Sequence, residues 1–207
     1  VLSKVSSAMK PIVSSKVVLV FGVLVFFLAA CSSNLKQVAI EDLLEGTIEV
    51  KLNPNDITPL AAEAVFTTKV PTQVSITVTG EEPLSHDFEE VATEHSLPIL
   101  GLYAGRNNNV EIRVTEPGKR YAEDTLSITT DPLPGFFPKI EIITAQRDKM
   151  EPGWTLSDFS AGENGIYRSQ PFFFDPNGEV RWFLDASFTG NLIYMIKRLA
   201  NGNLIFA

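Results

Sequence analysis

This 207-residue chain has little material for catalysis or metal binding by cysteine and histidine: its one cysteine is Cys31, and its two histidines are His86 and His95. A single cysteine excludes an intramolecular disulfide and a cysteine-cluster metal site. The histidines could serve as bases or ligands, but neither has a second partner nearby in the sequence. A strand-end histidine that bonds neighbouring backbone is far more common, and we therefore interpret both as structural residues.

Three further positions could suggest ligand binding. Asp175 and Asn177 supply oxygens of the kind that calcium prefers, but two oxygens fall short of the roughly six to eight that this ion takes, so we interpret them as turn residues. Trp182 would share a strand face with Val180 and Leu184, which favours a core position over a ligand-binding one. The sequence thus predicts no catalytic, cofactor-binding or metal-binding residue within the chain.

The charge balance limits the partners of the protein. The chain has 17 basic and 25 acidic residues, a formal net charge of −8. The basic residues before Cys31 are Lys4, Lys10 and Lys16, in a stretch without acidic residues, so the remainder is more acidic still. Nucleic-acid affinity comes largely from neutralised phosphates, and we therefore expect no nucleic-acid partner. The apolar residues, 44% of the chain, suffice for a packed core.

The first 30 residues are typical of a secretory signal. The three lysines precede an apolar run, Val17–Ala30, of 14 residues. As a helix this run would span about 21 Å, short of the ~30 Å hydrocarbon core of a bilayer, so a permanent span is the weaker interpretation. A basic segment followed by a short apolar segment matches a signal peptide. An ordinary signal peptide, or an anchor helix with an incidental cysteine, is the alternative to a lipoprotein signal.

The apolar run ends in Leu-Ala-Ala directly before Cys31, and this resembles the lipobox of bacterial lipoproteins. In that class the cysteine is lipidated and becomes the amino terminus, and several acyl chains on one residue give stable anchoring. Residues 1–30 would then be the signal peptide and residues 31–45 a tether. The resemblance implies lipidation of Cys31 and a place in the bacterial cell envelope. Ser32 in the next position favours the outer membrane.

From residue 46 onward the hydrophobic pattern has a period of two residues, which is typical of half-buried β-strands. Turn residues separate the runs. Seven short strands within residues 46–135 predict an immunoglobulin-like or fibronectin-like β-sandwich, and Tyr103 is typical of the tyrosine corner, whose hydroxyl bonds backbone in such folds. The expected strands are Thr47–Leu52, Ala61–Thr68, Gln73–Thr79, His86–Ala92, Leu97–Tyr103, Val110–Thr115 and Asp124–Thr130.

A domain boundary is expected at Asp131–Phe137, because its prolines interrupt strand pairing. Residues 136–207 would begin with a linker. Within it we expect an apolar strand at Lys139–Thr144, followed by a polar loop at Arg147–Gly165 that Trp154 anchors.

Two hairpins are expected after the linker. The first joins the strands Arg168–Phe174 and Glu179–Asp185 through an Asp-Pro-Asn-Gly turn of type I. The second joins Ile193–Leu199 and Leu204–Ala207 through Asn-Gly, a strong hairpin signal. Successive hairpins are typical of propeller blades. We therefore expect an all-β protein in which the sandwich is followed by the first blade of a β-propeller. Because the sequence stops within a strand, we expect a fragment of a longer protein.

Two parts of the sequence together resemble a known family. The segments SITVTG (75–80), SHDF (85–88) and HSLPILGLYAGRNNNVEI (95–112) resemble the N-terminal domain of bacterial aryl-sulfate sulfotransferases. The segments FFFDPNGEVRWFLD (172–185) and KRLANGNLIFA (197–207) resemble the start of the β-propeller of the same enzymes. The resemblance covers about residues 46–207.

The resemblance implies a transferase. Members of the family move a sulfuryl group from a phenolic sulfate ester to a phenol acceptor through a covalent sulfohistidine. Their catalytic side chains project from later propeller blades, so none is expected in this chain. The resemblance also implies a possible homodimer through the N-terminal domain. The alternative is a non-catalytic surface lipoprotein whose sandwich and propeller bind glycans or proteins, since both folds host many functions.

Overall fold

Strands make up nearly all the regular structure of this protein. The computed structural model describes residues 35–163, 166–186, 196–200 and 202–205. Two single-turn 3-10 helices, η2 (Ile40–Asp42) and η3 (Arg147–Lys149), interrupt the strands. The expected all-β fold class is confirmed. The strands are β1 (Lys36–Gln37), β2 (Leu44–Leu52), β3 (Ala62–Val78), β4 (Leu84–Ile99), β5 (Asn107–Glu116), β6 (Arg120–Thr129), β7 (Thr155–Glu163), β8 (Ile166–Phe174), β9 (Val180–Phe183), β10 (Lys197–Arg198) and β11 (Leu204–Ile205).

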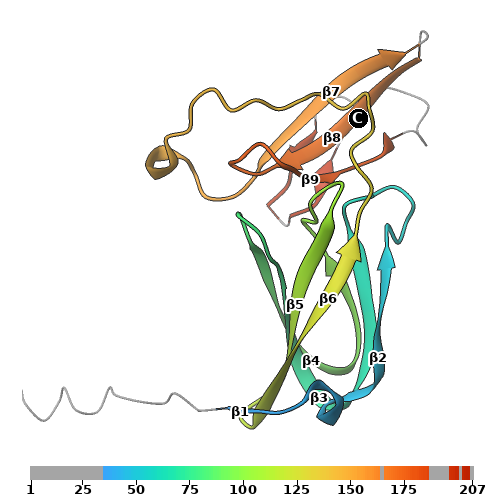
Figure 1. Cartoon of the computed structure of the whole chain (residues 1–207), viewed down its shortest axis with the longest axis vertical. Coiled ribbons are helices and arrows are strands. Elements are labelled where there is room, and N and C mark those ends of the chain that lie inside the picture. Colours follow the sequence, from blue (N-terminus) through green and yellow to red (C-terminus); the bar gives the residue numbers. More distant parts are fainter. Residues whose placement is uncertain (1–34, 164–165, 187–195, 201, 206–207) are drawn as a thin grey trace, which may run out of the picture. The chain divides into compact units, whose positions relative to one another are not determined.

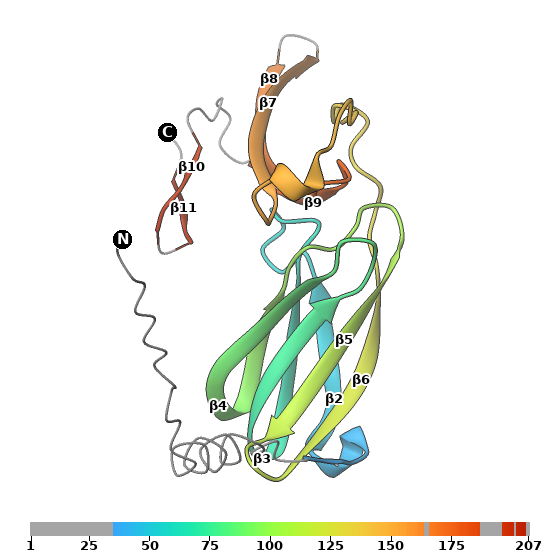
Figure 2. The same cartoon turned by 90° about the vertical axis from the view of Figure 1, so that its left-hand side faces the viewer.

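The first six strands form one curled, immunoglobulin-like sheet in the order β1-β6-β5-β3-β2, with β4 also paired to β3. The long strand β3 changes its neighbour along its length: its first part pairs with β2 and its second part with β5, while β4 follows it on the other side throughout. The sheet therefore curls around its own interior, with β3 and β4 as a long curved pair (Figures 1 and 2).

Strands β3 and β4 each join two strands that the sequence pattern separates. The register of the pair shifts between Thr67 and Thr72 and again between Thr72 and Val74. Irregularities of this kind bend a strand without ending it. Pro71, which has no N–H for a ladder bond, falls within the irregular segment, as prolines in sheets do. The bend explains why Ala61–Thr68 and Gln73–Thr79 form a single strand.

Alternation in the sequence locates the interior of this sheet. In β5 every second residue from Asn108 to Glu116 is buried, and Val110, Ile112 and Val114 are fully enclosed. Val74, Ile76 and Val78 fill the same interior from β3. Burying such side chains stabilises the fold by about 1.5–3 kcal/mol each before entropy is counted.

Strands β7, β8 and β9 form a second antiparallel sheet in that order. Two expectations for this part are wrong. Within Arg147–Gly165, expected to be a loop, residues Thr155–Glu163 form β7, because all nine of them pair with β8. Lys139–Thr144, expected to be a strand, pairs with nothing in the described residues, and Ile143 is 94% exposed. An apolar run without a neighbouring strand cannot satisfy its backbone in a sheet.

The two sheets share one apolar cluster. Phe172, Val180 and Phe183 of the second sheet belong to the same buried cluster as the interior of the first. Phe137, from the expected boundary segment, lies edge-on to Phe172 and Phe183, with ring centroids 5.3 Å and 5.2 Å apart. The residues from Leu35 onward accordingly belong to one compact unit. Of the second expected hairpin, the structure describes the short antiparallel pair β10–β11.

Candidate functional site

The two histidines lie far apart on β4. Their Cα partners on β3 are Ile76 for His86 and Phe66 for His95, near opposite ends of that strand. The ring of His86 meets Phe88 edge-on, with centroids 4.5 Å apart. The ring of His95 stacks on Phe66 at 4.8 Å. The histidines are therefore not brought together as a pair of ligands or as a base with its nucleophile.

A groove of about 440 Å³ follows β4 between the two histidines. The charged side chains that line it are four carboxylates and no lysine or arginine: Asp87, Glu89, Glu90 and Glu94. Transfer of a sulfuryl group requires cations or N–H donors around the oxygens that carry negative charge. An acidic groove would repel a sulfate ester, so we assign it no catalytic role.

His95 is part of a buried hydroxyl network at the bend of β3. Its Nε2 lies 3.0 Å from the hydroxyl of Thr72, which in turn lies 3.3 Å from the hydroxyl of Thr68. Thr68 donates to the carbonyl of Val70 at 2.8 Å. Burial lowers the pKa of His95 from its ordinary value of 6.5, while the carbonyl of Ala92 and the charge of Glu90 oppose that shift. The geometry supports the structural interpretation of this histidine.

Tyr103 occupies the loop between β4 and β5, and its hydroxyl bonds backbone as expected. It accepts from the N–H of Glu82 at 3.1 Å and donates to the carbonyl of the same residue at 3.3 Å. The side chain of buried Asn108 fixes the loop by bonding both the N–H and the carbonyl of Tyr103, at 2.8 Å and 3.1 Å. The tyrosine ring is thus held rigidly at one end of the immunoglobulin-like sheet.

The Asp175–Gly178 turn forms as the sequence predicts. Gly178 donates to the carbonyl of Asp175 at 2.9 Å, and Asp175 donates to Glu179 at 3.0 Å. Gly178 has φ +81°, a left-handed conformation that glycine adopts without a steric penalty. The carboxylate of Asp175 accepts from the N–H groups of Asn177 and Glu179, at 2.9 Å and 3.1 Å. Asp175 and Asn177 are therefore turn residues in the structure, as the sequence predicts.

The alternation of the sequence gives no indication of the most deeply buried charge in the described residues, Arg181. Its side chain is fully buried together with that of Asp175, and the two form an ion pair of 2.8 Å. Arg181 is also the extra residue of a β-bulge, because Phe173 pairs with Trp182 and Phe174 pairs with Val180. Bulges redirect side chains, and this one turns a charged side chain into the interior.

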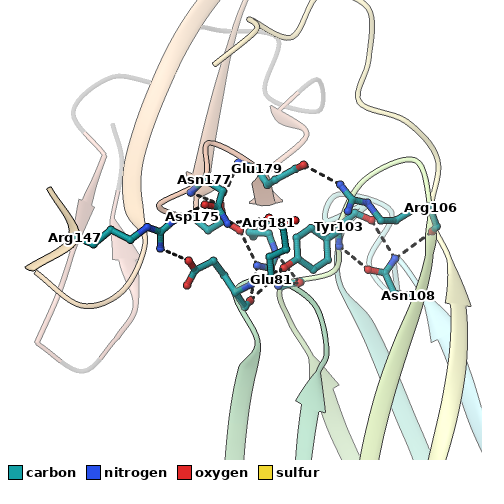
Figure 3. A network of polar contacts seen from close by, with 11 residues as sticks. Glu81, Tyr103, Arg106, Asn108, Arg147, Asp175, Asn177, Glu179 and Arg181 are labelled. Carbon is teal, nitrogen blue, oxygen red and sulfur yellow. Dashed lines mark hydrogen bonds and ion pairs between the residues drawn. The ribbon is translucent and has the colours of Figure 1, made fainter. Parts of the chain in front are cut away.

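Arg181 also bonds the loops at one end of the first sheet (Figure 3). Its Nε and Nη2 donate to the carbonyl of Gly101 at 3.0 Å and 2.8 Å. Its Nη1 donates to the carbonyl of Glu82 at 2.8 Å. The guanidinium lies 3.6 Å from the centroid of the Tyr103 ring and 4.9 Å from that of Trp154. Hydrogen bonds and aromatic rings therefore surround the charge on several sides.

Exposed ion pairs and hydrogen bonds encircle this buried pair. Arg106 reaches Glu179 at 2.9 Å, with about half of each side chain exposed. Arg147 bonds the side chains of Glu82 and Asn177, as Figure 3 shows in part. Their exposure means that they contribute little to stability. We call the buried pair of Arg181 and Asp175, with Gly101, Glu82 and Tyr103, the junction site.

The junction site has the chemistry of a structural contact. Four hydrogen bonds already occupy the guanidinium of Arg181, and the Asp175 carboxylate is bonded at both oxygens. No group of three or more His, Cys, Asp or Glu side chains in the described part of the chain is placed to hold a metal ion. Strict alternation along this strand does not predict that the Arg181 side chain is buried, because the bulge changes which residues point to the interior. Its spacing from Asp175 in a short hairpin is the one available signal.

The sequence also singles out Trp182 as a core residue and Cys31 as a lipidation site. Trp182 packs beside Leu184, Ala186 and Ile57 in a small second cluster, while Val180 belongs to the main one. The bulge thus separates Val180 from Trp182, contrary to the expected shared face, but Trp182 still has a packing role.

Cys31, the expected lipidation site, lies outside the described residues. Within the described segments, no helix has the length and hydropathy needed to cross a bilayer.

Comparison with known proteins identifies the immunoglobulin-like part. Residues 49–131 match the family model of the arylsulfotransferase Ig-like domain. The comparison with curated proteins found no match. The matched range extends from within β2 to just past the end of β6, and it contains Tyr103, Gly101 and Glu82 of the junction site. The sequence resemblance and this match agree: residues 49–131 are similar to the immunoglobulin-like domain of the arylsulfotransferase family.

Proposed function

We propose that this chain is the N-terminal part of an envelope-anchored aryl-sulfate sulfotransferase, which transfers a sulfuryl group from a phenolic sulfate ester to a phenol. The observation that supports this proposal is the match of residues 49–131 to the arylsulfotransferase Ig-like domain. The family indicates a sulfotransferase with phenolic substrates. The reaction through a sulfohistidine comes from the sequence resemblance and belongs to the proposal.

The proposal assigns no catalytic residue to this chain. A histidine nucleophile in such a reaction needs cations or N–H donors beside it to stabilise the transferred group. His95 is buried in a hydroxyl network, and the groove beside His86 is lined by carboxylates. Arg181, the deepest cation, is fully engaged in the junction site. The sequence resemblance implies that the catalytic side chains come from later propeller blades, and the proposal places the nucleophile there.

The test is an assay of the protein encoded by the whole gene. It measures release of 4-nitrophenol from 4-nitrophenyl sulfate with phenol as acceptor, and it compares the parent with His86→Ala and His95→Ala. We expect activity that His86→Ala leaves unchanged and that His95→Ala changes only in proportion to the folded fraction. Activity in the 207-residue chain that disappears in either variant would place the nucleophile here instead. No transfer with several donors and acceptors would favour the binding lipoprotein.

Anchoring through Cys31 is a separate proposal with its own test. The support is the basic segment, the apolar run and the Leu-Ala-Ala-Cys sequence of residues 28–31. When expressed in a Gram-negative host with radiolabelled palmitate, the chain should incorporate label and partition into detergent. Cys31→Ala should remove the label. The matched control is Ser32→Ala, which keeps the cysteine. A Cys31→Ala chain that is labelled and fractionates like the parent would refute lipidation at this residue.

A further inference from the structure

We propose that Arg181 is a latch that fixes the β7–β9 sheet on the end of the immunoglobulin-like domain, so that the two sheets fold and unfold as one unit. The charge partner of Arg181, Asp175, comes from the turn that precedes β9. Its carbonyl acceptors come from the immunoglobulin-like domain, at Gly101 and Glu82. Neither sheet by itself therefore satisfies this guanidinium.

Burial makes the arrangement energetically sensitive. Arg181 and Asp175 are both 0% exposed as side chains. Desolvation of two charges costs free energy, and a buried ion pair offsets this cost only when its geometry is good and its surroundings supply further hydrogen bonds. If the immunoglobulin-like domain moved away, Arg181 would lose three of its four hydrogen bonds and its contact with the Tyr103 ring. The guanidinium would then be exposed to water or remain buried without hydrogen-bond acceptors.

The backbone around the latch is shaped for close approach. A Cβ atom at Gly101 would lie 2.4 Å from the ring of Trp154, and Gly101 has φ +83°. A Cβ atom at Gly80 would lie 2.5 Å from the ring of Tyr103. Both glycines thus leave room for an aromatic ring next to the backbone, and each ring lies against the guanidinium of Arg181. The immunoglobulin-like domain presents a fitted surface to Trp154 and Arg181.

The latch also determines the conformation of the hairpin. One oxygen of Asp175 bonds the turn through Asn177 and Glu179, and the other bonds Arg181. The same carboxylate therefore connects the turn, the bulge in β9 and the immunoglobulin-like domain. This coupling does not depend on catalysis, and it is tested without an activity assay.

Tryptophan provides a local probe for the test. The two tryptophans, Trp154 and Trp182, both lie outside residues 46–135, whereas far-ultraviolet circular dichroism reports both sheets. Urea unfolding of the whole chain is followed with both probes. Coincident transitions are the criterion for one cooperative unit. We expect coincidence in the parent chain. In Arg181→Met we expect the tryptophan transition to move to lower urea and to separate from the later part of the dichroism transition.

Controls separate the latch from the exposed ion pairs. Arg106→Met removes an arginine of the same junction that is half exposed, and its two transitions should remain coincident near the parent midpoint. If Arg181→Met does not fold, Arg181→Lys retains the charge but loses the forked hydrogen bonds to Gly101. We then expect a smaller separation of the same sign, with faster tryptic cleavage after Arg147 and Lys149. The proposal would be overturned if the tryptophan and dichroism transitions coincide in Arg181→Lys or Arg181→Met as they do in the parent. It would also be overturned if the two transitions separate as far in Arg106→Met as in the Arg181 variant.

Discussion

The two sheets of this protein fill their interiors in different ways. The immunoglobulin-like sheet encloses aliphatic side chains at every second position, such as Val110, Ile112 and Val114, and bonds its buried His95 internally through Thr72. The interior of the β7–β9 sheet contains phenylalanines together with three fully buried polar side chains. These are Gln170, Asp175 and Arg181.

The difference shows which sheet depends on the other. A sheet that buries only apolar or internally bonded groups closes its own core. A sheet that buries an arginine bonded to a neighbour's carbonyl groups needs that neighbour. Strands β7 to β9 are too few to bury two faces alone, and small sheets of this kind are marginal in water. The immunoglobulin-like domain thus supports the second sheet through both the shared apolar cluster and the junction site.

The largest effect is expected from Asp175→Ala. This change removes the charge partner of Arg181 and the carboxylate oxygen that accepts two hydrogen bonds in the turn. Breaking one side of a buried ion pair costs about 3–5 kcal/mol. The measurement is the urea midpoint from tryptophan fluorescence. Asn177→Ala, in the same turn but with its side chain bonded to Arg147 and Glu81 at the surface, is the matched control. Equal losses in the two variants would contradict the importance of the buried pair.

Ile112→Ala tests the aliphatic interior of the first sheet. Ile112 is fully buried, and truncation of such a residue costs about 2–5 kcal/mol through lost burial and a cavity. If the two sheets are one unit, the tryptophan transition should shift with the dichroism transition, although both tryptophans belong to the other part. Val65→Ala, at a 43% exposed position, should have little effect. A shift in dichroism alone would show that the sheets unfold independently.

Sequence reasoning succeeded where one strand face meets solvent and the other meets the core. The alternation in β5 predicted Val110–Thr115 within the observed Asn107–Glu116. The Asp-Pro-Asn-Gly turn was also predicted, because its residues determine its geometry locally. Local chemistry and periodicity therefore suffice for strands of this type.

The pattern failed where pairing depends on distant residues. Thr155–Glu163 contains few apolar residues and forms a strand because β8 pairs with it. Lys139–Thr144 alternates well and has no strand beside it in the described chain. The bulge at Arg181 reverses the parity on which the expected position of Trp182 relied. In each case tertiary contacts outweighed the propensity of the segment.

A stabilising change is expected at Gln170. Its side chain is fully buried, and neither its amide nitrogen nor its amide oxygen has a hydrogen-bond partner among the described residues. An unsatisfied buried amide costs about 1–3 kcal/mol, so Gln170→Leu should raise the free energy of unfolding by up to that amount. Gln73→Leu is the matched control, because Gln73 bonds the carbonyl of Glu89 and its loss should not stabilise. A less stable Gln170→Leu chain would show that the amide is bonded in solution.

The smallest effect is the pH dependence that His95 contributes. Burial lowers its pKa in the folded state below the ordinary 6.5, so the unfolded chain takes up a proton more readily than the folded chain. The stability contributed by neutral His95 is fully present above about pH 6.5 and decreases as the pH falls from there through the folded-state pKa. The polar groups around this ring, the Thr72 hydroxyl, the Ala92 carbonyl and the Glu90 carboxylate, oppose the loss only in part.

Urea midpoints of the parent and of His95→Gln, which cannot titrate, are compared between about pH 7.5 and pH 5. We expect the parent to lose more stability than His95→Gln over this range, because the carboxylates of the β4 groove titrate in both. If the two chains lose stability in parallel, His95 is not desolvated in solution, and the internal bonding that distinguishes the first sheet from the second is weaker than the structure indicates.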